Sequence, residues 1–322
     1  MIISTRRRCL ASGLAAVVMV LSACTSATMP DEPEPTASVV ATQSPGARLR
    51  DLTIDSPAVG RSVQVRLQLP VAFDAEPDRQ WPVLWLLHGC CDTYDSWTRS
   101  TGIEDMPELA DVLVVMPEAG PVGFYSDWFS GGADWEAFHT AELPVLLRSQ
   151  WRAADDQAIA GLSMGGLGAM SYAARHPGMF QAAASYSGDL HTGYPGRAQD
   201  IQDLLAAFGE DPKALWGDPQ RQADVWAAHN PYDLAPKLEG IALFVSTGNG
   251  ELGPFDGPAT AALAQSIERD LALESEEFVN RLEELDIPVV YDAYGPGTHS
   301  WPYWERAFKA SLPTLLASFG AR

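Results

Sequence analysis

The chain has 322 residues, of which 46% are hydrophobic and 9% aromatic, enough to fill a sizeable core, so disorder over the whole chain is excluded. Asp and Glu number 42 against 21 Lys and Arg, and the formal net charge is −21. A surface of this charge repels a phosphate backbone, so no nucleic-acid partner is expected. The acidic residues are spread along the chain, which is typical of a solvated surface.

The first 23 residues are predicted to form a lipoprotein signal peptide. Three arginines at 6–8 precede an apolar segment at 10–21, which is too short to cross a bilayer of about 30 Å at about 1.5 Å per residue. The sequence LSAC at 21–24 resembles a bacterial lipoprotein cleavage box, in which the cysteine receives diacylglycerol and becomes the new N-terminus. We therefore expect export, with Cys24 anchored at the outer face of the plasma membrane or cell envelope. An ordinary signal peptide with a chance cysteine is the alternative.

Residues 24–47 are predicted to be a disordered tether, because they are rich in Pro, Ser, Thr and Ala and have no apolar period. One folded domain is expected over residues 48–322. This domain contains only two of the four cysteines, Cys90 and Cys91, which are adjacent. Neighbouring cysteines cannot form a long-range disulfide, and a vicinal one is uncommon, so the fold is not expected to depend on disulfides.

From residue 48 onward, strand-like and helix-like patterns alternate. Residues 63–69 alternate apolar and polar side chains, and six later segments are short apolar runs typical of strands buried on both faces. Those runs lie at 83–87, 112–116, 158–162, 182–186, 241–245 and 287–291, and helices are expected at 135–148, 165–175, 219–229, 259–285 and 304–319. This order predicts a single α/β domain with a mostly parallel sheet flanked by helices.

The sequence GLSMG at 161–165 is a Gly-x-Ser-x-Gly motif between an expected strand and an expected helix. In that context Ser163 stands on a sharp turn, where a side chain at 161 or 165 would collide with the neighbouring strand or helix. The Met164 amide then lies at a helix N-terminus and can stabilise an oxyanion. Ser163 is therefore the candidate nucleophile.

A serine hydroxyl needs a general base. Of the six histidines, only His299 follows the last expected strand, in the sequence GTHSW at 297–301. This glycine-containing loop can bring an imidazole to Ser163, so His299 is the candidate base.

These motifs and several others resemble the antigen-85 mycolyltransferases and the wider esterase-D-type branch of the α/β-hydrolases. The resemblance runs from about residue 82 to the C-terminus. The matching segments are FYSDW at 124–128, WEAF at 135–138, ELP at 142–144, GLSM at 161–164, GNG at 248–250 and GTHSWPYW at 297–304. The resemblance implies an α/β-hydrolase fold and a Ser–Glu–His triad that transfers acyl groups at the cell envelope.

Two glutamates are candidates for the acid of that triad. Glu268 lies ten residues before Phe278, the spacing at which the antigen-85 pattern places its helical glutamate. Glu251 follows the expected strand 241–245, where many hydrolases of this fold carry their acid. We favour Glu268 and keep Glu251 as the alternative.

The loop HGCC at 88–91 follows the expected strand 83–87. The resemblance implies that the Cys90 amide is the second oxyanion donor and that His88 shapes the loop. The antigen-85 enzymes have Asp-Gly-Leu-Arg here, and the Asp and Arg contact the sugar acceptor. Cys91 is expected to occupy the space of that arginine, so the acceptor should be less polar than trehalose, with a glycerolipid alcohol preferred.

We expect aromatic side chains to shield the acyl-enzyme from water, with Trp301, Trp128, Cys91 and His88 around the substrate pocket. No metal ligand cluster or cofactor motif is present, so no cofactor is expected. The sequence thus predicts a serine acyltransferase or esterase that moves an acyl group from an ester donor to a lipid or sugar alcohol. A secreted carboxylesterase that uses water is the alternative, and a non-catalytic envelope binding protein on the same fold is the second alternative.

Overall fold

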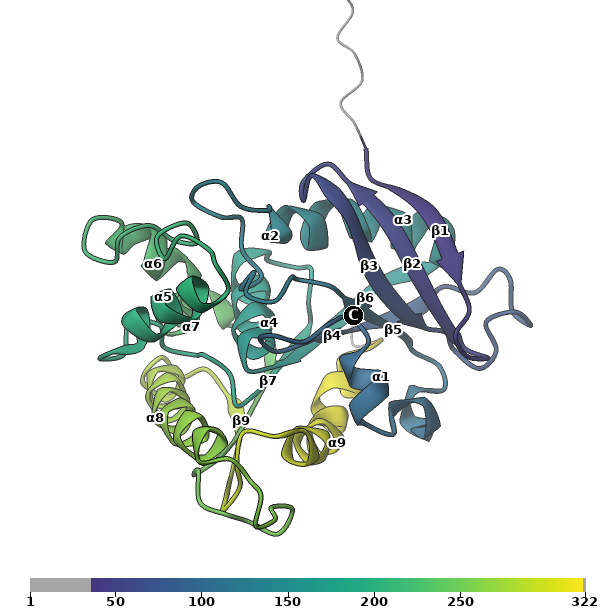
Figure 1. Ribbon diagram of the computed structural model, residues 1–322. Coiled ribbons are helices and arrows are strands. Elements are labelled where there is room, and N and C mark those ends of the chain that lie inside the picture. Colours follow the sequence, from purple (N-terminus) through teal and green to yellow (C-terminus); the bar gives the residue numbers. More distant parts are fainter. Residues whose placement is uncertain (1–35, 321–322) are drawn as a thin grey trace, which may run out of the picture. The chain divides into compact units, whose positions relative to one another are not determined.

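The computed structural model describes residues 36–320, and the chain from Thr36 onward is one compact unit. Its described residues form a nine-stranded sheet in the order β1-β2-β3-β5-β4-β6-β7-β8-β9 (Figure 1). The strands are Ser38–Gln43 (β1), Leu49–Ser56 (β2), Arg61–Gln68 (β3), Trp81–Leu87 (β4), Leu113–Pro117 (β5), Ala153–Leu162 (β6), Ala182–Tyr186 (β7), Ala242–Gly248 (β8) and Val289–Gly295 (β9). Strands β1, β2, β3 and β5 pair antiparallel with one another, and β5, β4, β6, β7, β8 and β9 are parallel neighbours.

Helices connect the parallel strands. The α-helices are Ser96–Ser100 (α1), Trp135–Ala137 (α2), Leu143–Trp151 (α3), Met164–Arg175 (α4), Arg197–Ala207 (α5), Ala223–His229 (α6), Pro231–Leu234 (α7), Ala262–Glu284 (α8) and Trp301–Ala317 (α9). Short helical turns complete the set at Ile103–Asp105 (η1), Pro107–Leu109 (η2), Phe138–Glu142 (η3) and Ala235–Leu238 (η4). No helix in the range 36–320 is long and apolar enough to cross a membrane.

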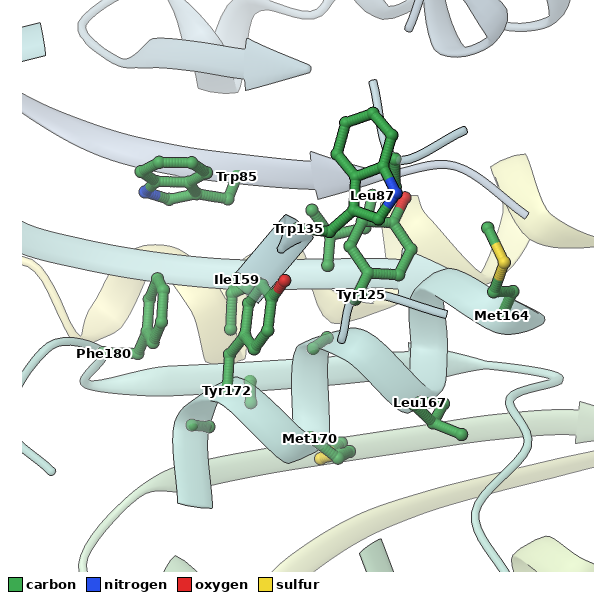
Figure 2. Packing of buried hydrophobic residues seen from close by; sticks show 14 of the residues in the cluster. Trp85, Leu87, Tyr125, Trp135, Ile159, Met164, Leu167, Met170, Tyr172 and Phe180 are labelled. Atoms are coloured by element: carbon green, nitrogen blue, oxygen red, sulfur yellow. The ribbon is translucent and has the colours of Figure 1, made fainter. Parts of the chain in front are cut away.

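The central strands are buried on both faces because successive side chains point to opposite sides of the sheet. In β4, Val83, Trp85 and Leu87 pack into one apolar cluster and Leu84 and Leu86 into another. The first cluster contains side chains of α3, α4 and α8, and the second contains those of α1 and α9. Figure 2 shows the first cluster, where side chains of α4 face those of the strands. This three-layer arrangement is the α/β-hydrolase fold that the sequence predicts, and the prediction is confirmed.

The folded domain begins earlier than predicted. Residues 38–43 form β1, within the stretch expected to be a disordered tether, and pair with β2. The pattern of β1 is invisible in the sequence because this edge strand is almost wholly exposed and so has no apolar face. Residues 1–35, which contain the predicted signal peptide, Cys24 and the first half of the predicted tether, lie outside the described residues.

Candidate active site

Ser163 stands on the turn between β6 and α4, with φ 52° and ψ −124°. The two motif glycines are required there. A Cβ on Gly161 would lie 2.1 Å from the carbonyl oxygen of Gly165, and a Cβ on Gly165 would lie 2.5 Å from that of Leu87. Both distances are far below van der Waals contact, so the turn forms only with glycine on each side of the serine, as the motif predicts.

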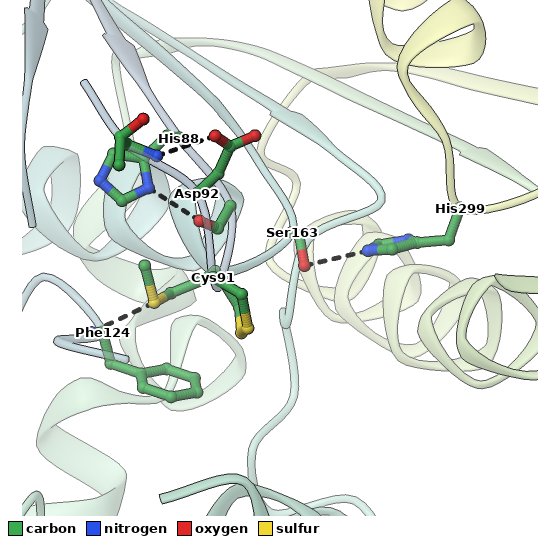
Figure 3. Close-up of a disulfide and its surroundings, with 10 residues drawn as sticks. His88, Cys91, Asp92, Phe124, Ser163 and His299 are labelled. Atoms are coloured by element: carbon green, nitrogen blue, oxygen red, sulfur yellow. Dashed lines mark hydrogen bonds between the residues drawn. A yellow bond between two sulfur atoms is a disulfide. The ribbon is translucent and has the colours of Figure 1, made fainter. Parts of the chain in front are cut away.

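His299 reaches Ser163 from the loop between β9 and α9. Its Nε2 lies 3.0 Å from Ser163 Oγ, and its Nδ1 lies 3.0 Å from Glu268 Oε2. Nδ1 donates to the carboxylate, which leaves Nε2 to accept the serine proton. The His299 amide also donates to the Ala264 carbonyl at 3.1 Å, which ties the loop to α8. The structure therefore brings the three side chains together in one hydrogen-bonded chain (Figure 3 shows the serine and the histidine).

Glu268 is fully buried on α8 and receives several hydrogen bonds. Its Oε1 accepts from the Gly248 amide at 2.6 Å, the Ser187 hydroxyl at 2.8 Å and the Thr247 hydroxyl at 3.2 Å. Burial alone raises the pKa of Glu268, but the hydrogen bond and charge of His299, with the Gly248 and Ser187 donors, outweigh burial and hold the pKa below its usual value. The carboxylate is therefore ionised and able to orient the imidazole.

The alternative acid, Glu251, lies on the surface just after β8. Its carboxylate accepts from the Asn249 side chain at 3.2 Å, and its amide donates to the same side chain at 2.9 Å. These bonds close a local turn. The structure thus places Glu268, and not Glu251, against His299.

The loop after β4 carries the other predicted oxyanion donor. Gly89, Cys90, Ser163 and Met164 line one cavity. Within the described residues, no hydrogen bond occupies the Cys90 amide. Met164 is the first residue of α4, so its amide has no partner within the helix. Cys90 and Cys91 are joined by a vicinal disulfide, the uncommon pairing for adjacent cysteines.

The cavity at Ser163 has a volume of about 750 Å³. Its apolar lining comes from Phe124, Leu162, Met164, Leu204, Leu263, Ile267, Trp301 and Trp304. The predicted pocket residues Trp301 and Cys91 are among its walls, together with the catalytic candidates Ser163 and His299. A cavity with this volume and this apolar lining suits a substrate with an apolar portion.

Two predicted pocket residues lie elsewhere. Trp128 packs against the core and donates from its indole nitrogen to the Gly123 carbonyl at 3.2 Å. His88 is buried, and its Nε2 accepts from the Ala119 amide at 3.0 Å. Burial lowers the pKa of His88, so its ring is neutral and shapes the loop. The sequence indicates that Trp128 and His88 lie in segments near the site, but it does not show the direction in which their side chains point.

The cavity also has a polar wall, which the sequence does not predict. Arg197, at the start of α5, contacts Asp189, and its Nε lies 3.1 Å from Glu274 Oε1. Asp189, Arg197, Asp200, Asp270 and Asp92 all line the cavity. No motif marks these residues, because they come from four separate segments that only the fold brings together.

A serine–histidine–carboxylate chain lies above the carboxyl ends of a parallel sheet, beside two backbone amides that carry no hydrogen bond within the described residues, and this arrangement is typical of serine-dependent acyl-transfer enzymes. The Esterase family model matches residues 56–315, which is most of the chain. The chain therefore belongs to the esterase family, and it is an enzyme that acts on esters.

Curated relatives are acyltransferases. The chain is 30% identical over 301 residues to the diacylglycerol acyltransferase/mycolyltransferase Ag85B of Mycolicibacterium smegmatis, covering 88% of this chain and 89% of the relative. Identity to Ag85B of Mycobacterium leprae is also 30%, over 87% of this chain and 86% of the relative. The predicted resemblance to the antigen-85 enzymes is confirmed.

Solved structures agree with this assignment. Mycobacterium tuberculosis MPT51 (FbpC1) is 25% identical, with a TM-score of 0.70 over 85% of this chain and 99% of that structure. The fluorophosphonate-binding serine hydrolase FphF of Staphylococcus aureus shares the fold at 22% identity, with a TM-score of 0.65 over 85% of this chain and 99% of its own.

Proposed function

We propose that the chain transfers acyl groups through a covalent acyl-enzyme on Ser163, with His299 as general base and Glu268 as the acid that orients it. The observation that carries this proposal is the continuous hydrogen-bonded chain from Ser163 Oγ through both ring nitrogens of His299 to Glu268, at 3.0 Å on each side. The ionised state of buried Glu268 supports it, because an anion beside Nδ1 stabilises the imidazolium formed during catalysis.

In the first half-reaction, Ser163 Oγ attacks the ester carbonyl while His299 Nε2 takes its proton. The tetrahedral oxyanion lies against the amides of Met164 and Cys90, whose hydrogen-bonding capacity is unused. The intermediate collapses to the acyl-enzyme, and His299 gives its proton to the departing alcohol. In the second half-reaction, His299 deprotonates an acceptor alcohol, which attacks the acyl carbonyl. The bond to Ser163 Oγ then breaks, and His299 returns the proton to this oxygen.

We infer that the acceptor is an uncharged alcohol of the glycerolipid kind. The cavity joins an apolar lining to a wall with the carboxylates of Asp189, Asp200 and Asp270, and its cation, Arg197, is bound to Asp189 and Glu274. Such a wall disfavours phosphate-bearing alcohols by charge repulsion. The diacylglycerol named for the relatives has the required neutral head and long apolar chains.

Two measurements test the nucleophile. A fluorophosphonate probe should label Ser163, and Ser163→Ala should abolish both labelling and ester turnover. Ser130→Ala, which changes an exposed serine outside the cavity, is the matched control and should leave both unchanged. Labelling or turnover that survives Ser163→Ala would place the nucleophile elsewhere.

Product analysis tests the acceptor. With a long-chain acyl ester as donor, added diacylglycerol should divert the acyl group into triacylglycerol, and trehalose should divert less. Release of free acid alone in the presence of every acceptor would make the chain a carboxylesterase that uses water. Absence of any turnover, with the domain folded, would support a binding protein instead.

We also propose that the chain is exported and anchored to the membrane through Cys24, after removal of residues 1–23. The basic and apolar segments of the leader and the LSAC sequence support this proposal. Cys24→Ser should release the protein from the membrane fraction of the producing cell. Equal retention of the variant would contradict the lipid anchor.

A further inference from the structure

The loop 88–91 runs directly beside the proposed nucleophile. A Cβ on Gly89 would lie 2.5 Å from Leu162 Cδ1 and 3.3 Å from Ser163 Cβ, so this loop packs closely against the serine turn. The disulfide of Cys90 and Cys91 lies near the Ser163 hydroxyl (Figure 3). Cys91 is exposed and Cys90 half-buried, so the disulfide faces solvent in the cavity.

Neighbouring segments hold both ends of this loop. The Tyr125 hydroxyl donates to the His88 carbonyl at 2.9 Å, and the Cys91 amide donates to the Pro121 carbonyl at 2.8 Å. The Cys90 amide lies between these two anchored residues and is free to serve an oxyanion. With both ends of the loop held, the backbone torsions of Gly89, Cys90 and Cys91 together set the direction of this amide.

Cys91 adopts a backbone conformation that is unfavourable for a residue with a Cβ. Its φ is +67°, in the left-handed region that glycine favours. The anchors at His88 and Cys91 fix the positions of the loop ends, but neither fixes this dihedral. The covalent link to Cys90 restrains it, because the eight-membered ring of a vicinal disulfide includes the peptide bond between the two residues.

We propose that the Cys90–Cys91 disulfide is a positioning element for the acyl-transfer reaction, which holds the Cys90 amide toward the oxyanion, and that turnover depends on its oxidised state. This proposal rests on the proposed function of Ser163. It predicts that a dithiol reductant lowers activity without removing the nucleophile or the base.

The reductive step balances with a dithiol as the electron donor. One thiolate of the dithiol attacks a cysteine sulfur, the Cys90–Cys91 bond breaks, and the leaving cysteine thiolate takes a proton. The second thiol of the reductant then displaces the other cysteine, which also becomes a thiol. The protein gains two electrons and two protons, and the dithiol becomes a cyclic disulfide. The loop is then free to leave the left-handed conformation at Cys91.

The test uses the full chain, with turnover of a neutral ester measured before and after treatment with dithiothreitol. Reduction should lower kcat at least tenfold and leave KM nearly unchanged, because an oxyanion donor acts mainly in the transition state and the loss of one costs about 10²–10³ in kcat. Reoxidation should restore kcat. Maleimide labelling with mass spectrometry confirms that Cys90 and Cys91 are the thiols released.

Cysteine variants distinguish an effect of the loop conformation on kcat from any other effect of the reductant on the protein. Cys90→Ala/Cys91→Ala should have a low kcat and no response to dithiothreitol. Cys90→Ala/Cys91→Gly should recover part of the lost kcat, because glycine adopts the positive φ without a steric cost. A structural role alone would lower thermal stability and not produce this kcat-specific recovery.

Failure of the disulfide proposal and failure of the proposed function give different experimental results. If reduced wild type keeps its kcat while the thiols are shown to be free, the disulfide does not position the amide, and the proposed function is unaffected. If Ser163→Ala retains turnover, the proposed function itself fails. If the double alanine variant does not fold, the reversible loss of kcat in the wild type still decides the proposal.

Discussion

Two carboxylates on helix α8, six residues apart, are buried to almost the same degree, and their pKa values shift in opposite directions. Glu268 is 0% exposed and has a lowered pKa, whereas burial raises the pKa of Glu274, 1% exposed, to about 7. Burial is the largest cause in both cases, so the difference comes from the partners. Glu268 receives bonds from His299, Gly248 and two hydroxyls, and Glu274 has the Arg197 guanidinium at 3.1 Å and the His191 amide at 3.2 Å.

At Glu268 the hydrogen bond and charge of His299, with the Gly248 and Ser187 donors, outweigh burial, whereas at Glu274 the charge of Arg197 and the His191 amide do not. Glu268 is surrounded on both oxygens, which suits an acid that must remain anionic beside a histidine. Glu274 has fewer donors and changes its charge near neutral pH, which suits a structural contact between α5 and α8. Substitutions at four positions test this difference between Glu268 and Glu274.

Glu268→Gln should lower kcat by about 10³–10⁴-fold, because an amide neither stabilises the imidazolium nor fixes the correct tautomer of His299. The fold should be retained, since the glutamine oxygen can accept the bonds that reach Oε1. Steady-state kinetics and circular dichroism check both points. A loss of less than tenfold would show that His299 works without this carboxylate.

Glu274→Gln should change the pH dependence of stability and leave turnover close to that of the wild type. The pKa of Glu274 is raised from 4.5 in the unfolded chain to about 7 in the folded protein, so the folded state binds more protons between these values. Its contribution therefore becomes less favourable as pH rises from about 4.5 through about 7, by at most about 3 kcal/mol.

Denaturant unfolding at several pH values measures this effect. The stability of Glu274→Gln relative to the wild type should rise over that range and then stay constant. Glu277→Gln removes an exposed acid of the same helix and is the matched control. A pH-independent difference between wild type and Glu274→Gln would mean that Arg197 keeps Glu274 ionised throughout.

Ser187→Ala should lower kcat roughly tenfold, because one hydrogen bond to a charged group is worth about 1.5–3 kcal/mol. Its hydroxyl donates to Glu268 and accepts from the Trp304 indole at 3.2 Å. The acidic limb of the pH–rate profile should move to higher pH, since Glu268 loses a donor that lowers its pKa. An unchanged profile would show that the other donors suffice.

Glu251→Gln should have the smallest effect, within experimental error in both kcat and stability. Its carboxylate is exposed and bonds only to Asn249 within its own turn. Comparison of its kinetics with those of Glu268→Gln ranks the two acids that the sequence leaves open. A larger loss for Glu251→Gln would reverse the assignment of the triad acid.

The central parallel strands were predictable because they are short apolar runs, and β7 was predicted at 182–186, its observed bounds. The run predicted at 287–291 as a strand buried on both faces is instead the half-exposed edge strand β9, which begins at Val289 and contains an aspartate. Strand β2 and helix α5 were not predicted. The sequence LRDLTIDS of β2 mixes charges into its alternation, and α5 begins with Arg-Ala-Gln-Asp, which has no apolar face until Ile201. In both cases tertiary contacts outweigh weak local signals.

The site residues that were predictable are those that stand in local sequence motifs. Ser163 and His299 stand in motifs whose glycines are required by local backbone geometry, so the sequence marks them. Asp189, Arg197 and Glu274 meet only after β7, α5 and α8 have packed, and nothing local marks them. The disulfide was not predicted because adjacency allows it without requiring it.

The distances along the chain between the residues of the site have a consequence for folding. Ser163 and His299 are 136 positions apart, and Glu268 and Ser187 are 81 apart. Contacts of such long sequence separation form slowly, because the entropy of closing each loop must be overcome before the contact stabilises anything. The three side chains of the proposed triad therefore meet only when the loop between β9 and α9, the last described elements, has docked. During synthesis, a fragment that ends before this loop contains the serine turn but lacks His299, so we expect it to be inert toward esters if His299 is the base that we propose.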